Sequence, residues 1–310
     1  MEKWIDLSDY PVRPVLKLLL TDKTTKQNIV FATGSYTHMG SRFMEDSHID
    51  AELLLGIDRM VIQPRVLKEA YDQAQRTKKK AEVMTPSWIV NKMNNHCDEE
   101  WFGYRGAFNT ETDDRSWVVS KDTVRFPDGK SWQEYVYSAR LEITCGEAPY
   151  LVSRYDTTTG ESIPVERRIG ILDRKLRVVG ENTGTKEEWF KWVVKAYQST
   201  YGYEYQGDNL LLARINLLIT FVDYMEKHWN EKPTTEDLRK IANIIVWNIW
   251  QMDGLTGMVP FYRKETFRQL SFFDYAVDGE EKREENAQIP ARIFDWRSRE
   301  SVTYNSLKER

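Results

Sequence analysis

The sequence predicts an α/β protein organised around a parallel β-sheet. Two segments combine a short apolar strand that ends in an acidic residue, Glu142 or Glu204, with a glycine-containing turn and a helix. A third apolar segment follows a predicted helix and ends in Asp253-Gly254. Repeated units of this kind favour parallel pairing of the strands. Ligands of such sheets bind beyond the carboxyl ends of the strands, so we expect a site near the three acids.

Length and composition are typical of a packed globular protein. The chain has 310 residues, of which 41% are hydrophobic and 13% aromatic, enough to bury a sizeable core. The formal net charge is −4, which excludes a global basic field, so any DNA contact must come from local patches. The N-terminus lacks a signal-peptide pattern and no apolar run reaches the length of a membrane span. We therefore expect a cytoplasmic protein without membrane contact.

Cysteine and histidine give no signature of a disulfide framework or a metal site. Cys97 and Cys145 are the only cysteines, too few for either. His96, Cys97 and Asp98 are adjacent on one predicted helix, where neighbouring side chains point in different directions. We therefore predict no metal ligands.

Residues 1–80 are predicted to form an N-terminal extension of mixed α/β character. A helix is expected near Pro14, because proline suits a first helical turn. Runs of β-branched and aromatic residues predict short strands at 29–36 and 57–64. Residues 65–80 predict a polar helix that ends in basic residues, which either contact phosphates or form a solvated helix end.

The remaining residues, 81–310, are predicted to form the sheet domain. Thr85 can cap a helix whose first residue is Pro86. Charged clusters and turn residues predict a surface excursion at 98–135. A strand end, a turn of small residues and a helix start are then expected at 141–151, where free N–H groups of the helix could hold a cofactor.

Two further features precede the second acid. Glu142 and Glu204 are 62 residues apart, much further than in a compact nucleotide-binding unit, so we predict an insertion at about 156–185. A basic segment at 164–182 is the best local candidate for a phosphate-contacting surface. A solvated connection explains this segment equally well, and both interpretations stay open. Helices are expected over Thr185–Ser199, after Glu204 and over Thr235–Asn243.

The order of these residues resembles that of adenine-specific DNA methyltransferases and, more closely, of restriction endonuclease modification subunits. The matching residues are Thr85, Pro86, Glu142, Cys145, Gly146, Glu204 and Asp253. The resemblance covers about residues 80–260 and implies a Rossmann-like sheet that binds S-adenosylmethionine. It implies that the Thr85-Pro86 helix packs against this cofactor. It further implies that Glu142 and Cys145-Gly146 hold the methionine part, Glu204 the ribose and Asp253 the adenine.

The sequence departs from the family pattern in two places. Ala148 occupies the position of the usual second glycine of the first motif, which hinders close approach of the cofactor to the backbone. The Pro-Pro-aromatic motif, which in the family binds the target adenine, is absent because the sequence has no Pro-Pro pair. No catalytic residue is therefore assigned.

Three functions are compatible with these observations. The first is a DNA adenine-N6 methyltransferase-like subunit of a restriction–modification system, which needs a partner restriction or specificity subunit for catalysis and target recognition. The second is a non-catalytic methyltransferase-fold subunit that binds DNA or acts as a scaffold in a restriction or defence complex. The third is an unrelated small-molecule enzyme on a similar sheet. Fold alone does not choose among them.

Overall fold

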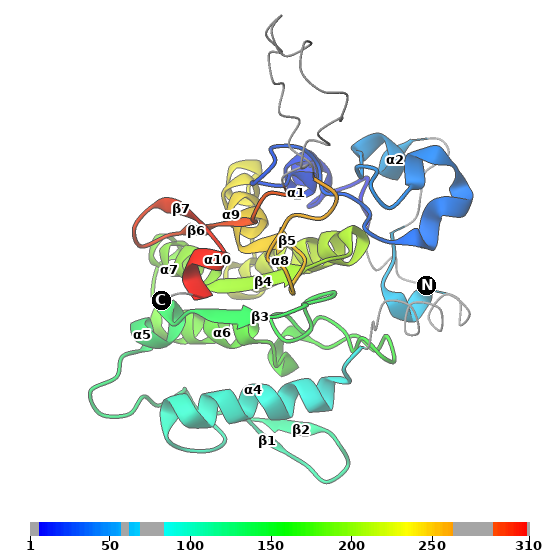
Figure 1. The fold of residues 1–310 in the computed structure, drawn as a ribbon. Helices are drawn as coiled ribbons and strands as arrows, with labels where there is room; N and C mark the ends of the chain where they lie inside the picture. The colour runs from blue at the N-terminus through cyan, green and yellow to red at the C-terminus, as the bar shows by residue number, and fades with distance from the viewer. Residues whose placement is uncertain (1–5, 57–61, 69–83, 263–287, 309–310) are drawn as a thin grey trace, which may run out of the picture.

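A small parallel sheet with helices packed around it forms the centre of the molecule, as the computed structural model in Figure 1 shows. The structure describes residues 6–56, 62–68, 84–262 and 288–308. Within these stretches, no helix has the length and apolar character needed to cross a membrane. The combination of helices with small β-sheets confirms the predicted mixed α/β class.

The sheet has three parallel strands in the order β3-β4-β5. The strands are β3 (Arg140–Glu142), β4 (Thr200–Glu204) and β5 (Ile249–Gln251). The register pairs Glu142 with Gly202 and Glu204 with Gln251. All three strands therefore end at one edge of the sheet, as the sequence predicts for parallel pairing.

Two pairs of helices connect the strands. These are α6 (Ile171–Asn182) with α7 (Lys186–Gln198), and α8 (Gly207–Trp229) with α9 (Thr235–Asn248). The helices predicted around α7 and α8 are confirmed, but α9 continues past its predicted end at Asn243. Asn248 ends α9 against the sheet, where its side-chain amide donates to Tyr197 O at 2.9 Å and to Thr200 O at 3.1 Å.

Lys175 joins the C-terminal ends of two helices beside the sheet. Ser138 is the C-cap residue of α5 (Trp132–Tyr137), and Ser199 is the C-cap residue of α7. The buried Lys175 Nζ donates to Ser138 O at 2.7 Å, to Ser199 O at 3.2 Å and to Ser199 Oγ at 2.8 Å. A cation suits these positions because helix C-termini carry partial negative charge. Burial nevertheless lowers the pKa of Lys175 well below its ordinary value.

Residues 98–135 are less exposed than the sequence predicts. α4 (Ser87–Phe102) continues through Asp98, which is buried. A hairpin of β1 (Asn109–Glu111) and β2 (Trp117–Val119) follows and lies under α4 (Figure 1). The predicted surface excursion is therefore wrong for Asp98, because its charge has a partner in a distant part of the chain.

The N-terminal segment consists mainly of short helices. They are η1 (Arg13–Val15), α1 (Leu16–Leu20), η2 (Gly34–Met39), η3 (Ser41–Phe43), α2 (Ala51–Leu55) and η4 (Arg65–Leu67). The helix expected near Pro14 is confirmed. The strand predicted at 29–36 is reduced to an isolated antiparallel bridge between Val30 and His48. On its other side the backbone of Val30 pairs with the side-chain amide of Gln251 at 2.9–3.0 Å. The strand predicted at 57–64 and the helix at 65–80 lie largely outside the described residues.

The C-terminal part forms a hairpin of β6 (Arg292–Asp295) and β7 (Glu300–Thr303), followed by α10 (Asn305–Lys308). Ala291 and Ile293 pack with Tyr203 and Trp250 in a small apolar cluster. The hairpin therefore covers part of the sheet with its own core, separate from the larger core around α8.

Candidate cofactor-binding site

The carboxyl edge of the sheet brings the predicted acids of β3 and β4 close to one turn. This turn, residues 143–151, follows β3 and is fixed to β4 by a hydrogen bond from Cys145 N to Tyr203 O of 2.8 Å. Three of its residues have left-handed backbones, namely Thr144 (φ 46°), Gly146 (φ 53°) and Ala148 (φ 64°). Alternate residues in this conformation produce a tight turn of the backbone. Ala148 is therefore a strained residue at the position where the family has glycine.

Glu142 holds the far end of this turn. Its Oε1 accepts from Tyr150 N at 3.3 Å and its Oε2 accepts from Leu151 N at 3.1 Å. Burial raises the pKa of Glu142 well above its ordinary value, although both N–H donors oppose that shift, and the nearby Glu204 adds to it. Both carboxylate oxygens thus stabilise the turn.

No helix begins at residue 151, so this prediction is wrong. The chain runs out through an isolated bridge between Tyr155 and Ser162 and returns to start α6 at Ile171. There, Ile171 N donates to Tyr150 O and Leu172 N to Leu151 O, both at 2.8 Å. These first-turn N–H groups are therefore used within the chain, and the helix N-terminus is not a free cradle for a cofactor.

Glu204 connects the turn to the end of β4. Its Oε2 accepts from Gly146 N at 2.9 Å, and its Oε1 accepts from Gln206 N at 3.1 Å. Among the described residues, a Cβ added at Gly146 would meet only Met84 Cε, at 3.9 Å, so there is space on this side of the glycine. The carboxylate of Glu204 and the partly buried backbone of Gly146 are consequently neighbours at the sheet edge.

Asp253 lies just after β5 and organises its own turn. Its Oδ1 accepts from Leu255 N at 2.8 Å and from Thr256 N at 3.3 Å. Among the described residues, its Oδ2 has no hydrogen-bond partner, and the side chain is partly exposed. One carboxylate oxygen of Asp253 therefore remains available to a ligand.

Cys145 does not present its thiol to this edge. The side chain is buried, and a Cβ added at Gly202 would lie 3.3 Å from Cys145 Sγ. The absence of a side chain at Gly202 thus makes room for the sulfur. Burial raises the pKa of the Cys145 thiol well above its ordinary value. Only the backbone of Cys145 could contact a cofactor here.

The Thr85-Pro86 segment lies beside the turn, but Thr85 does not cap the helix. α4 begins at Ser87, and Ser87 N donates to Asp156 Oδ2 at 2.7 Å. Burial of Asp156 favours a higher pKa, but hydrogen bonds from Thr158 and Ser87 outweigh it and lower the pKa to about 2. Thr85 O accepts from Thr157 Oγ1 at 3.0 Å. The predicted cap is thus supplied by an acid 69 residues away.

A buried polar network under the turn was not predicted. Glu147 Oε1 accepts from Arg65 N at 2.6 Å, and its Oε2 accepts from Tyr155 OH at 2.5 Å. Asn216 of α8 donates to Glu147 O at 3.0 Å and to Tyr155 OH at 3.1 Å. Asn216 interrupts an apolar helix, and this interruption is the sequence signal that could have located the network.

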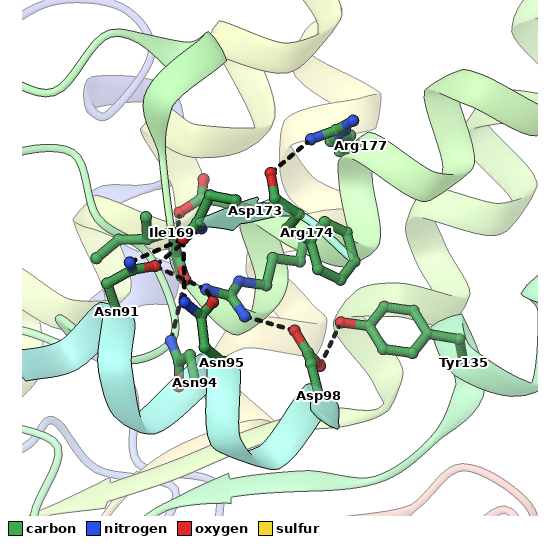
Figure 2. Close-up of polar contacts among 12 residues, drawn as sticks. Asn91, Asn94, Asn95, Asp98, Tyr135, Ile169, Asp173, Arg174 and Arg177 are labelled. Atoms are coloured by element: carbon green, nitrogen blue, oxygen red, sulfur yellow. Dashed lines mark hydrogen bonds and ion pairs between the residues drawn. The ribbon is translucent and has the colours of Figure 1, made fainter. Parts of the chain in front are cut away.

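A second buried network joins α4 to α6. Figure 2 shows Asn91, Asn95 and Asp98 on one side of α4, facing Arg174. Arg174 forms an ion pair with Asp98 and donates to Asn91 Oδ1 at 2.9 Å and to Asn95 Oδ1 at 2.8 Å. Tyr135 OH donates to the second oxygen of Asp98 at 2.9 Å.

These contacts change the interpretation of the basic segment at 164–182. Arg174 and Lys175 are buried, and Arg168 is paired with Asp223 at 2.6 Å. Neither a phosphate-contacting surface nor a solvated connection describes them, because their charges are used inside the fold. Arg167 remains exposed.

No family model, curated protein or solved structure matches this chain.

Glu142→Gln is expected to make stability less dependent on pH. Burial raises the pKa of Glu142 in the folded state, so its protonated form favours folding. This contribution to stability is fully present below the ordinary pKa of 4.5, and it is lost as the pH rises through the higher pKa of the folded state. Urea unfolding measured between about pH 5 and about pH 8 should show a smaller loss of stability for the variant than for the wild type. The exposed Glu161→Gln is the matched control. Identical pH profiles for Glu142→Gln and wild type would refute this role of burial.

Proposed function

We propose that this chain is a DNA adenine-N6 methyltransferase-like subunit of a restriction–modification system that binds S-adenosylmethionine. The observation that carries the proposal is the shared edge of β3, β4 and β5, where Glu142, the 143–151 turn, Glu204 and Asp253 follow the strand ends. The strand order corresponds to one half of a doubly wound nucleotide-binding sheet, in which the first strand borders the ligand crevice.

The residues at this edge fit the cofactor in three places. Glu204 carries acceptor oxygens for ribose hydroxyls, since each carboxylate oxygen has two lone pairs. The open backbone at Gly146 allows close approach of the methionine part. Asp253 Oδ2 can accept from the adenine amino group. When bound, the cofactor supplies an electrophilic methyl group, and these residues only bind and orient it.

Two of the residues carried over from the family have a positioning role instead. Both oxygens of Glu142 are engaged by the backbone of the turn, and the thiol of Cys145 is buried behind it. They would shape the methionine pocket without touching the cofactor through their side chains.

The outer edge of β3 supports the need for a partner chain. Within the described residues, β3 pairs only with β4. Leu141 and Ile143 at this edge are 45% and 63% exposed, although both are large apolar residues. A partner restriction or specificity subunit that covers this edge could supply the Pro-Pro-aromatic loop that this sequence lacks, together with contacts to the DNA target.

The alternative is a non-catalytic scaffolding or DNA-binding subunit on the same fold. It is favoured by Glu142, whose carboxylate is used completely for holding the turn, and by the missing Pro-Pro-aromatic motif. Cofactor binding separates the two functions, because a pure scaffold has no need of a cofactor site at Glu204.

Calorimetric titration tests the proposed cofactor. The wild type should bind S-adenosylmethionine, and Glu204→Gln should weaken binding about tenfold or more, because the charged acceptor for the ribose is lost. Glu161→Gln on an exposed loop should bind like the wild type. An absence of binding heat at millimolar cofactor with folded wild-type protein would contradict the proposal. Labelled methyl transfer to DNA is expected only when the partner chain is added.

A further inference from the structure

Asp253 belongs to a short turn, residues 253–258, that follows β5 and is closed by its own hydrogen bonds. Asp253 N donates to Met258 O at 2.9 Å, and Gly257 N donates to Asp253 O at 2.7 Å. Asp253 Oδ1 accepts from Leu255 N at 2.8 Å within the same turn. Backbone and carboxylate are therefore held as one unit, so a displacement of the turn also displaces Asp253 Oδ2.

This turn lies against the aromatic ring of Tyr203, which comes from the neighbouring strand β4. A Cβ added at Gly254 would lie 2.9 Å from Tyr203 Cε2, 3.1 Å from its hydroxyl oxygen and 3.4 Å from Cζ. The backbone itself does not require glycine here, because the φ angle of Gly254 is outside the left-handed region. Glycine at this position therefore serves the close contact between the turn and the ring.

The ring of Tyr203 has little freedom to move away from the turn. Tyr203 is 6% exposed, and its ring centroid lies 5.8 Å from those of Trp250 and Tyr304. Packed interiors yield little to an added group, so a methyl group between ring and turn has to shift the less enclosed side. The turn is that side, because Gly254 is only partly buried and Leu255 is 94% exposed.

Tyr203 also borders the other two parts of the proposed cofactor site. Its carbonyl oxygen accepts from Cys145 N of the 143–151 turn at 2.8 Å. Glu204 follows Tyr203 in the chain, and Glu204 O accepts from Met252 N at 3.1 Å. A single residue of β4 thus connects the turn after β3, the acid of β4 and the turn after β5.

We propose that Tyr203 is a positioning residue that places Asp253 against the adenine amino group of the bound cofactor. This inference rests on the proposed cofactor site, in which Asp253 Oδ2 accepts from that amino group. The ring acts through its contact with Gly254. The contact makes the site selective for a 6-amino purine over a 6-oxo purine, because an ionised carboxylate only accepts hydrogen bonds and repels a carbonyl oxygen.

Two ligands measure this selectivity by calorimetric titration of the full chain. S-adenosylhomocysteine carries the amino group, whereas S-inosylhomocysteine carries a carbonyl oxygen at the same position of the purine. The wild type should bind the first about tenfold or more tightly than the second, as expected for one hydrogen bond to a charged group. The readout is the ratio of the two dissociation constants, because partial unfolding of a variant weakens both ligands alike.

Gly254→Ala tests the contact between the turn and the ring. The added Cβ should push the turn away from Tyr203 and reduce the ratio of dissociation constants to about twofold or less. Tyr203→Phe keeps the ring and should keep the wild-type ratio. The matched control is Gly184→Ala, since a Cβ at Gly184 would meet no described atom within 4 Å. This control should also keep the wild-type ratio.

A double variant separates the contact from a general loss of stability. Tyr203→Leu in the Gly254→Ala background removes the three ring atoms that the added Cβ would meet. The turn can then return toward its original place, so the ratio should rise again to about fivefold or more. Tyr203→Leu alone should lower the ratio, because the turn loses its support. If Gly254→Ala does not fold, the comparison of Tyr203→Leu with Tyr203→Phe carries the test.

Four results would overturn the proposal. An unchanged ratio in Gly254→Ala or in Tyr203→Leu would show that the ring does not set the position of Asp253, while the cofactor site itself would stand. A lost ratio in Tyr203→Phe would assign the selectivity to the hydroxyl group. Equal affinities in the wild type would show that Asp253 does not contact the amino group. Failure of the folded wild type to bind either ligand would refute the cofactor site, and this proposal with it.

Discussion

Asp98→Ala is expected to lower the free energy of unfolding by about 3–5 kcal/mol. The variant leaves the guanidinium of Arg174 buried without its carboxylate, and removes the acceptor of Tyr135 OH. The cost of such a change comes mainly from the uncompensated charge, since Asn91 and Asn95 offer Arg174 only neutral acceptors. Equilibrium unfolding in urea measures it directly.

A double-mutant cycle distinguishes the uncompensated charge from simple loss of packing. Arg174→Met in the Asp98→Ala background removes the unpaired cation, so the double variant should be more stable than the sum of the single effects predicts. The control is Arg105→Gln, which breaks an exposed pair with Glu99 and should cost no more than about 1 kcal/mol. A loss below about 1 kcal/mol in Asp98→Ala, or strict additivity in the cycle, would contradict this account.

Arg214→Leu is expected to cost about 3 kcal/mol or more, through a different mechanism. Arg214 of α8 is fully buried, and its Nε donates to Ile249 O at 2.8 Å. Its Nη1 donates to Leu19 O at 2.6 Å and to Thr21 O at 3.0 Å, at the C-terminal end of α1. Leucine fills the space of the side-chain stem but leaves three carbonyl groups without this donor, each at about 1–3 kcal/mol.

The contacts of Arg214 also predict which part of the fold loses stability in Arg214→Leu. Because the side chain ties α1 to β5, Arg214→Leu should release the N-terminal segment, and limited proteolysis should cut before residue 84 sooner than in the wild type. Arg239→Leu, on the exposed side of α9, should change stability by no more than about 0.5 kcal/mol. Unchanged stability and proteolysis in Arg214→Leu would show that the three carbonyl groups find other donors. Burial lowers the pKa of Arg214 to about 10, and the neighbouring Asp22 opposes this shift.

The parallel sheet could be predicted because its signals are local. Each strand has an acid at or just after its end, followed by a turn, and parallel pairing then brings Glu142 and Glu204 to one edge. The order of the strands follows from the same units. The helices predicted around them rest on apolar periodicity and on caps such as Thr185, which are also local.

The wrong predictions concern contacts between distant residues. No periodicity shows that the side chain of Gln251 pairs with the backbone of Val30, 221 residues away. Nor could the burial of Arg174 be read from its basic neighbours, because its partner Asp98 is 76 residues earlier. The helix expected at 151 fails because Glu142 binds the N–H groups that would have begun it.

Lys175 has a consequence for the entropy of assembling this chain. Its bond to Ser199 closes a loop of 24 residues, whereas the contact between Val30 and Gln251 spans 221. Loop-closure entropy grows with the logarithm of length, so the shorter loop costs about 2 kcal/mol less to form. The unfolded chain can therefore close the contact between α6 and the end of α7 at a smaller entropic loss than the distant contacts that the N-terminal segment adds.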